Sequence, residues 1–308
     1  MKHRPTYWRW LMLVFLSIAL WQPGLAQKKV QVVTKTVSQK LEQKLDSGIL
    51  IEGRKASVTV TGWEKDFALV EIDLISKHED VDVALKEIDY IQYIISKTST
   101  RYILKNSFFA KKQNTKIKSS LSVAYRVFVP MHTKVHIDDQ YGEVELINLF
   151  GQVDLNVNFC EVRFERLFGA LRGTSDYSEW LGKDFDGDIR LRSKKTEIEL
   201  TNFAGQVDID NNYGDISLSP TAMLQSMKVS SRHGKVDLQV NSMDAFNYNV
   251  KVNSSYIDLP SAESAYVTEA DNGQTYRFER SNGLHKANIS ISNLLYPVKI
   301  YAVNLSNR

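Results

Sequence analysis

A nine-residue period in the middle of the chain constrains its fold more than any other feature. From position 142 to position 214, every ninth residue is small or suits a tight turn, and Cys160, Ser178 and Thr196 hold three of these positions. The other positions hold glycines, namely Gly142, Gly151, Gly169, Gly187, Gly205 and Gly214. The second residue after each position is apolar and the fourth is apolar or glycine, with mostly polar residues between them. Alternation with a period of two indicates a strand with one buried face, so each unit predicts one short strand and one turn.

The units alternate between two kinds, which doubles the repeat to 18 residues. Seven residues after the turn position, one kind carries the apolar side chains of Leu149, Leu167, Phe185 and Phe203. The other kind carries the polar side chains of Asn158, Asp176, Lys194 and Asn212. An antiparallel meander gives no reason for two distinct corners to alternate, whereas two-strand coils stacked about 4.8 Å apart do. We therefore predict a mainly β chain with a parallel β-solenoid of two short strands per 18-residue coil, and a β-sandwich is the alternative.

The segments on either side of the repeats differ from them. Residues 27–130 contain strand-like alternation, and the apolar spacing from Ala84 to Ile95 predicts a helix, so this part is expected to be a small mixed β/α capping module. The stretch from Lys111 to Ser120 is expected to be a hairpin loop. Residues 131–260 hold the solenoid repeats, and residues 261–308 alternate again and predict a C-terminal β cap over the last open edge.

The first residues predict export from the cytoplasm. Lys2, Arg4 and Arg9 precede a short apolar stretch that ends on small residues at Ala26, which is typical of a signal peptide over residues 1–26. The apolar stretch is too short to span a bilayer comfortably, although an uncleaved N-terminal anchor remains the alternative. We expect a periplasmic, outer-surface or extracellular protein with no transmembrane span after cleavage. Because Cys160 is the single cysteine, neither an intramolecular disulfide nor a lipid anchor after the apolar stretch is expected.

Charge argues against a nucleic-acid partner. The net charge of +3 comes from the three basic residues of the leader, and without them the basic residues equal the 36 acidic ones. No long block of lysine and arginine remains to neutralise phosphates. A hydrophobic content of 43% is sufficient for a folded core.

One outward position of the repeat holds only carboxylates, namely Glu143, Glu161, Glu179, Glu197 and Asp215. If stacked in register, each neighbouring pair would repel by about 0.9 kcal/mol in water. Bound calcium or a basic partner would offset the repulsion, which makes these residues weak candidates for a metal site. Alternatively the side chains extend into water and pair with neighbours such as Arg163 and Arg192. No other cofactor is expected. A mostly aromatic set precedes the same strands: Tyr141, Phe159, Tyr177, Lys195 and Tyr213.

A second outward column reads Asp154, Arg172, Arg190 and Asp208. Acids and arginines on one face of a parallel β-helix are how some polysaccharide lyases abstract a proton, so a lyase-like enzyme is the alternative function. A surface ion ladder is the simpler interpretation. The sequence has no nucleophile elbow, phosphate loop or dinucleotide fingerprint.

The order of features resembles a known family. A signal peptide, the segment Val60-Thr61-Gly62-Trp63 with Asp66, a helix and repeats such as Gly142-Glu143-Val144-Glu145-Leu146 resemble the putative-adhesin β-strand-repeat family over most of the chain. The resemblance implies an extracytoplasmic bacterial protein, from a family of largely unknown function with no catalytic residues to carry over. We expect a non-enzymatic, secreted cell-envelope protein that serves as an adhesin or a structural scaffold. Its expected partner is a surface glycan or another envelope protein.

Overall fold

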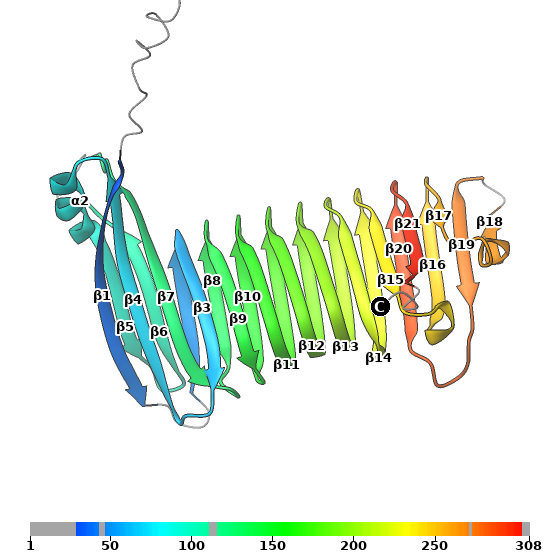
Figure 1. Ribbon diagram of the computed structural model, residues 1–308, viewed down its shortest axis with the longest axis horizontal. Coiled ribbons are helices and arrows are strands. Elements are labelled where there is room, and N and C mark those ends of the chain that lie inside the picture. The colour runs from blue at the N-terminus through cyan, green and yellow to red at the C-terminus, as the bar shows by residue number, and fades with distance from the viewer. Residues whose placement is uncertain (1–28, 43–46, 111–115, 271–272, 304–308) are drawn as a thin grey trace, which may run out of the picture.

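The computed structural model describes residues 29–42, 47–110, 116–270 and 273–303. In this part the molecule is elongated and mainly β, and most neighbouring strands run parallel (Figure 1). The prediction of a mainly β, largely parallel chain is therefore confirmed. The signal peptide predicted at residues 1–26 lies outside the described residues. Within the described ranges, no helix has the length and apolar character needed to cross a membrane.

Three long strands form the centre of the repeats. They are β11 (Glu161–Asp176), β12 (Glu179–Lys194) and β13 (Glu197–Asn212). Each pairs in parallel with the next, and paired residues are 18 positions apart, as for Glu161 with Glu179. Backbone pairing continues around the apolar corner, so the two short strands expected in each 18-residue repeat are merged into one strand of 16 residues. We use the word coil for each 18-residue unit.

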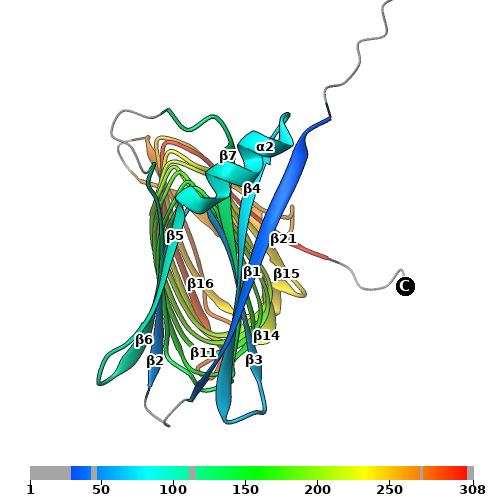
Figure 2. The same cartoon turned by 90° about the vertical axis from the view of Figure 1, so that its left-hand side faces the viewer.

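The strands of successive coils form two walls that face each other across the core (Figure 2). Further strands continue both walls on either side of β11–β13, namely β8 (Val135–Gln140), β9 (Glu143–Leu149), β10 (Gln152–Asn158), β14 (Ile216–Arg232) and β15 (Val236–Val240). The first face is the outer side of the wall that contains β9, residues 161–165 and residues 197–201. The second face is the outer side of the wall that contains β8, β10 and residues 170–176.

The N-terminal strands extend the same two walls. In the second wall, β8 pairs with β2 (Gly48–Arg54), which is followed by β6 (Arg101–Phe108) and β5 (Ile91–Lys97). In the first wall, β9 pairs with β3 (Ala56–Trp63). Beyond β3 lie β7 (Ser120–Pro130), β4 (Phe67–His78) and β1 (Gln31–Glu42). Backbone pairing is thus continuous between these strands and the repeats, and the domain boundary at residue 130 stays a prediction.

Two local expectations for this region are wrong. The helix is shorter than expected, because α2 (Val81–Glu87) and the 3-10 helix η1 (Ile88–Tyr90) are followed directly by β5. Ile91 and Ile95 therefore lie on a strand, where a spacing of four also places two residues on one face. The strands that flank the stretch from Lys111 to Ser120 do not form a hairpin, because β6 and β7 lie in different walls; residues 111–115 themselves lie outside the described residues.

The C-terminal strands are not stacked in chain order. The elements are η2 (Met243–Ala245), β16 (Asn247–Asn253), β17 (Ile257–Asp258), η3 (Ser264–Tyr266), β18 (Val267–Glu269), β19 (Thr275–Arg280), β20 (Asn288–Leu294) and β21 (Val298–Ala302). β20 pairs in parallel with β14 on one side and β16 on the other, and β21 lies likewise between β15 and β17.

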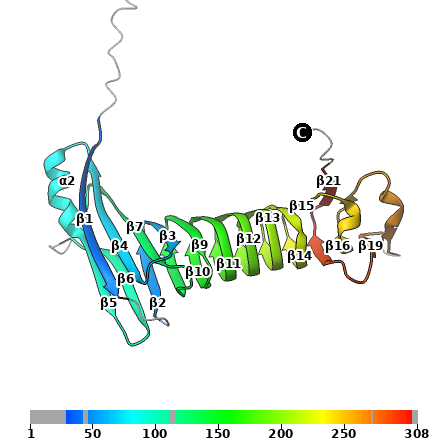
Figure 3. The same ribbon diagram turned by 60° about the horizontal axis from the view of Figure 1, so that its bottom comes forward.

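This strand order differs from the C-terminal cap that the sequence predicts. β20 and β21 form an inner coil, whereas the outer edge beyond β16 is covered by β19 and β18, which pair antiparallel (Figure 3). β20 and β21, which the sequence predicted as part of the cap, therefore lie within the stack, and a cap over residues 261–308 stays a prediction. Strand alternation in the sequence specifies which side chains are buried, but not which coil a strand joins.

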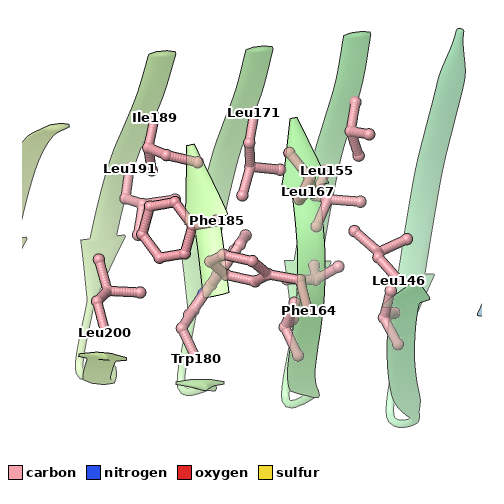
Figure 4. Packing of buried hydrophobic residues seen from close by; sticks show 14 of the residues in the cluster. Leu146, Leu155, Phe164, Leu167, Leu171, Trp180, Phe185, Ile189, Leu191 and Leu200 are labelled. Atoms are coloured by element: carbon pink, nitrogen blue, oxygen red, sulfur yellow. The ribbon is translucent and has the colours of Figure 1, made fainter. Parts of the chain in front are cut away.

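Two interior glycines leave space for two large aromatic side chains. The fourth position of the repeat is aliphatic or aromatic except at Gly173 and Gly182. A β-carbon at Gly173 would lie 2.4 Å from Cη2 of Trp180, and one at Gly182 would lie 2.3 Å from Cζ of Phe164. Both aromatic side chains are buried, and Figure 4 shows them packed against each other and Phe185. The core therefore keeps its volume by exchanging a side chain in one coil for a larger one nearby.

A glycine column holds the corners close together. Gly169, Gly187 and Gly205 are paired in register, and a β-carbon at Gly187 would lie 2.0 Å from the carbonyl oxygen of Gly169. The other glycines of the period show the same close approach, since a β-carbon at Gly142 or Gly151 would meet backbone oxygen at 1.8 or 2.7 Å. At Gly214 the corresponding distance is 2.1 Å.

We predict that Gly187→Ala lowers the free energy of unfolding by about 1–3 kcal/mol, because the new methyl group forces two coils apart. Urea denaturation measures the change, with the exposed Ser217→Ala as the control. Equal midpoints for the two variants would contradict this account of the glycine column.

Candidate functional site

The carboxylate column expected from the sequence is assembled on the first face. Glu143, Glu161, Glu179 and Glu197 are direct neighbours in the parallel register. Asp215 precedes β14 at the next corner, where its carboxylate accepts a hydrogen bond from the backbone N–H of Lys235 at 2.9 Å. Four carboxylates therefore lie side by side, while the fifth is engaged by the chain itself.

Few basic groups compensate this column. Arg163 forms an ion pair with Glu161 on the first face, as expected. Arg192, the other expected partner, lies on the second face, where it binds Asp208 at 2.8 Å. The outward positions of the first face between residues 143 and 219 carry eight acidic side chains, against Arg163 and Lys183 as the basic ones. This face is therefore strongly acidic.

The acidic side chains do not converge on a point. Within the described ranges, no group of three His, Cys, Asp or Glu side chains is arranged to hold a metal ion. A column of carboxylates one coil apart presents its charges along a line, which suits a partner with several separate positive charges better than one chelated ion. Calcium binding by these residues stays a prediction.

A column of exposed rings runs beside the carboxylates. We call this the aromatic column, and its positions are held by Tyr141, Phe159, Tyr177, Lys195, Tyr213 and His233. Tyr141 and Phe159 stack with ring centroids 4.9 Å apart, and Phe159 and Tyr177 stack at 5.0 Å. Tyr213 stacks on His233 at 4.3 Å. Tyr141 is 59% exposed and Tyr177 is 50% exposed, so these rings are not part of the core.

The backbone conformation makes aromatic residues an unusual choice here. All positions of the aromatic column have φ between 49° and 68°, in the left-handed region. The opposite corner has the same requirement, with φ between 52° and 56°, and meets it with Asn148, Arg166, Asp184 and Asn202. Asparagine and aspartate tolerate this conformation, whereas a bulky side chain there costs about 1–2 kcal/mol. A stacked ring pair contributes about 0.5–1.5 kcal/mol to stability, so stacking roughly offsets the cost of the left-handed backbone without a clear net gain in stability.

Lys195 places a cation within the aromatic column. Its ammonium lies 4.4 Å from the centroid of the Tyr177 ring and donates a hydrogen bond to the Tyr177 hydroxyl at 2.5 Å. This hydrogen bond raises the pKa of Lys195, so the group stays charged. A shallow hollow of about 540 Å³ adjoins it, lined by Phe159, Cys160, Glu161, Tyr177, Ser178, Glu179, Lys195 and Glu197. This corner therefore combines exposed aromatic rings, carboxylates and the amine of Lys195, which lies against the Tyr177 ring.

The candidate lyase residues lie together on the second face. Asp154, Arg172, Arg190 and Asp208 form one column in the parallel register. Arg172 lies 3.9 Å from Asp154, and the neighbouring Asp188 lies 3.1 Å from Arg190. These partly exposed pairs form a surface ion ladder, in which each arginine side chain contacts a carboxylate and contributes little to stability.

The sequence revealed the aromatic column but not its conformation. The four Tyr and Phe rings each precede a small residue and then an acid, as in Tyr177-Ser178-Glu179. Their position directly before a turn residue was the signal that could have indicated a left-handed backbone. The sequence alone did not distinguish an exposed stack from partly buried rings.

Comparison with known families gives a match in the second half of the chain. Residues 186–293 match the family model described as Toastrack DUF4097. The match confirms the resemblance to a β-strand-repeat family of unknown function. No curated protein matches the sequence.

Several solved structures are similar over most of their length. A putative adhesin from Parabacteroides merdae is 10% identical, with 87% of this chain and 96% of that chain covered and a TM-score of 0.35. A putative adhesin from Bacteroides fragilis is 12% identical, with coverages of 87% and 97% and a TM-score of 0.30. A putative cell adhesion protein from Clostridium sporogenes is 8% identical, with coverages of 88% and 99% and a TM-score of 0.22. None of these TM-scores is high enough to support an inference about this chain.

We predict that Tyr213→Asn changes the free energy of unfolding by less than about 1 kcal/mol, because easier backbone geometry offsets one lost ring contact. The matched variant is Phe185→Ala, which removes a buried ring stacked on Phe203 and should cost about 3–5 kcal/mol. Denaturant unfolding of both variants measures the difference. A loss at Tyr213 as large as that at Phe185 would mean that the aromatic column mainly stabilises the fold.

Proposed function

We propose that this protein is a non-enzymatic, exported cell-envelope scaffold of the adhesin type, which binds partners that carry amine or guanidinium groups. In this proposal the repeats form a parallel β-solenoid with two strand faces per 18-residue coil, and the partner lies along the corner between the aromatic and carboxylate columns. The observation that supports it most is the contrast between the two corners, of which only one carries rings where asparagine suffices.

The chemistry of this corner favours a cationic partner over a neutral one. Neighbouring carboxylates one coil apart repel, and an added positive charge removes this repulsion. An ammonium over an aromatic ring gains about 0.5–2 kcal/mol, depending on how far it is desolvated. Lys195 already occupies such a position over Tyr177, so the aromatic column accommodates an amine at coil spacing.

The required amines have two natural sources at a cell surface. A basic protein segment offers lysine and arginine side chains, and a partly deacetylated glycan offers amino groups along a polymer. Both present several positive charges in a line, as the carboxylate column requires. The lyase-like alternative draws no support from the paired arginines of the second face, and export rests on the signal peptide predicted from the sequence.

Calorimetric titration of the purified protein tests this function with three probes: chitosan oligomers, chitin oligomers of equal length and an oligolysine peptide. We expect chitosan and oligolysine to bind and the acetylated chitin oligomers not to bind, because the N-acetyl groups of chitin replace the charged amines of chitosan on the same sugar backbone. The relative affinity of chitosan and oligolysine identifies the source of the amines. Binding of chitin as tight as that of chitosan, or no binding of either polycation, would overturn the proposal.

Paired variants locate the binding surface. Glu179→Gln with Glu197→Gln should weaken polycation binding by about three- to tenfold, because each exposed charge pair is worth at most about 1 kcal/mol. Asp188→Asn with Asp210→Asn removes the same charge from the second face and should leave binding within about twofold of the original. Equal losses for both double variants would indicate nonspecific attraction to the whole protein.

A further inference from the structure

A buried polar column runs inside the coils, next to the corner that carries the aromatic column. Its members are Asp139, Ser175, Ser193, Asn211, Ser231 and Asn293, and the buried apolar Val157 lies between Asp139 and Ser175 in the register. Asn211 shows what an amide does at this place. Its Nδ2 donates to the carbonyl oxygens of Thr196 at 2.9 Å and Gly214 at 3.1 Å, and its Oδ1 accepts from the Ser193 hydroxyl at 2.7 Å.

Asn293 repeats this arrangement in the inner C-terminal coil. Its Nδ2 donates to the carbonyl oxygens of Gly234 and Tyr296, both at 2.9 Å. In both cases one acceptor lies at the corner of the adjacent coil, and the other lies three residues further along the chain. The position therefore requires a hydrogen-bond donor between two carbonyl groups.

Asp139 occupies the same position at the start of the repeats, and its side chain is fully buried at 0% exposure. A β-carbon at Gly142, three residues further on, would lie 1.8 Å from the Ala56 carbonyl oxygen and 2.6 Å from Oδ2 of Asp139. The equivalent β-carbon at Gly214 would lie 2.1 Å from the Thr196 carbonyl oxygen. Ala56 and Gly142 thus correspond to Thr196 and Gly214, with Asp139 in place of Asn211.

The remaining surroundings of Asp139 offer little to a carboxylate. Gly53 is its partner in β2, where Ser193 is the partner of Asn211, so the hydroxyl donor is missing. Oδ1 has no hydrogen-bond partner among the described residues. An ionised aspartate has no hydrogen to donate to a carbonyl group, whereas a protonated one has a single O–H donor.

We propose that Asp139 is protonated in the folded protein and donates to the Ala56 or Gly142 carbonyl, so that its ionisation loosens the junction between β2–β3 and the first coil. The protonated acid supplies the hydrogen-bond donor that an asparagine amide supplies at the equivalent positions, and ionisation removes this donor. Below its ionisation range the junction is hydrogen-bonded as in the later coils, and above that range a buried charge faces two carbonyl oxygens.

The groups around Asp139 support this protonation state. Burial raises its pKa to about 7, and the charge of Asp138 on the same strand acts in the same direction. The backbone N–H of Gln140 and the thiol of Cys160 oppose this rise by hydrogen bonding.

The other titratable groups near the junction provide no nearby positive charge. Tyr125 of β7 has a raised pKa, first because of burial and then because of Asp139. Burial also raises the pKa of Cys160 to about 11, so its thiol stays neutral at the pH values that matter here. Arg54 and Lys55, at the corner between β2 and β3, have exposed side chains.

The pH dependence follows from the direction of the shift. In the unfolded chain Asp139 ionises near pH 4, whereas in the folded protein it keeps its proton until about pH 7. Between these values the folded state binds more protons, so stability falls as the pH rises through this window. A rise from 3.8 to about 7 corresponds to an increase on the order of a thousandfold in the unfolding constant.

Asp139→Asn tests the proposal, because an amide supplies the donor at every pH. Denaturant unfolding of the original protein and the variant is compared at pH 5 and pH 8, with Asp138→Asn as the control for loss of a neighbouring charge. We expect the unfolding constant of the variant to be lower than that of the original protein by about tenfold at pH 5 and by about a thousandfold at pH 8. A difference between the two proteins that is the same at both pH values would overturn the proposal.

Two measurements on the original protein do not depend on the variant folding well. Infrared spectra should show a band of a buried protonated carboxyl group at pH 6 that is lost near pH 7. Labelling of Cys160, whose Sγ lies 3.9 Å from Oδ2 of Asp139, should accelerate at pH 8 beyond the rise of a free thiol. Absence of the infrared band at pH 6, or labelling that follows the free thiol, would overturn the proposal.

Discussion

Parallel backbone pairing between residues 18 positions apart places each side chain beside its counterparts in the two adjacent coils. No position can be chosen independently, because every side chain in the register lies beside the residue at the same position one coil away. Inside the molecule this explains why Trp180 needs a glycine in the coil before it. Outside, it turns ordinary surface residues into columns of like charge or stacked rings.

The two corners of the coil meet the same backbone requirement with different chemistry. At three of its four positions one corner uses asparagine or aspartate, which adopt a left-handed conformation at low cost, and Arg166 holds the fourth. The other uses rings that gain little net stability and lie beside a line of carboxylates. Both columns would be easier to build from neutral, compact residues. Their composition is therefore more simply explained by contact with a partner than by stability, and that explanation is the basis of the proposed function.

The sequence was sufficient for features that depend on periodicity. The register of Glu143 to Glu197 and the two kinds of corner follow from an 18-residue spacing. Three features could not be derived in this way. Ile91 and Ile95 fit one face of a helix and one face of a strand equally well, and alternation in residues 288–302 does not specify which coils they join. Asp139 resembles any surface acid until its position between two carbonyl groups is known.

The place of β20 and β21 also determines when the protein can finish folding. A stack that grows along the chain can proceed as far as β14 and β15, but the next coil in space is formed by residues 288–302. β16 must then leave room for strands that are synthesised after it. The C-terminal residues therefore join two parts of the stack that would otherwise lack a common partner, and the last coils gain their native contacts together rather than one by one.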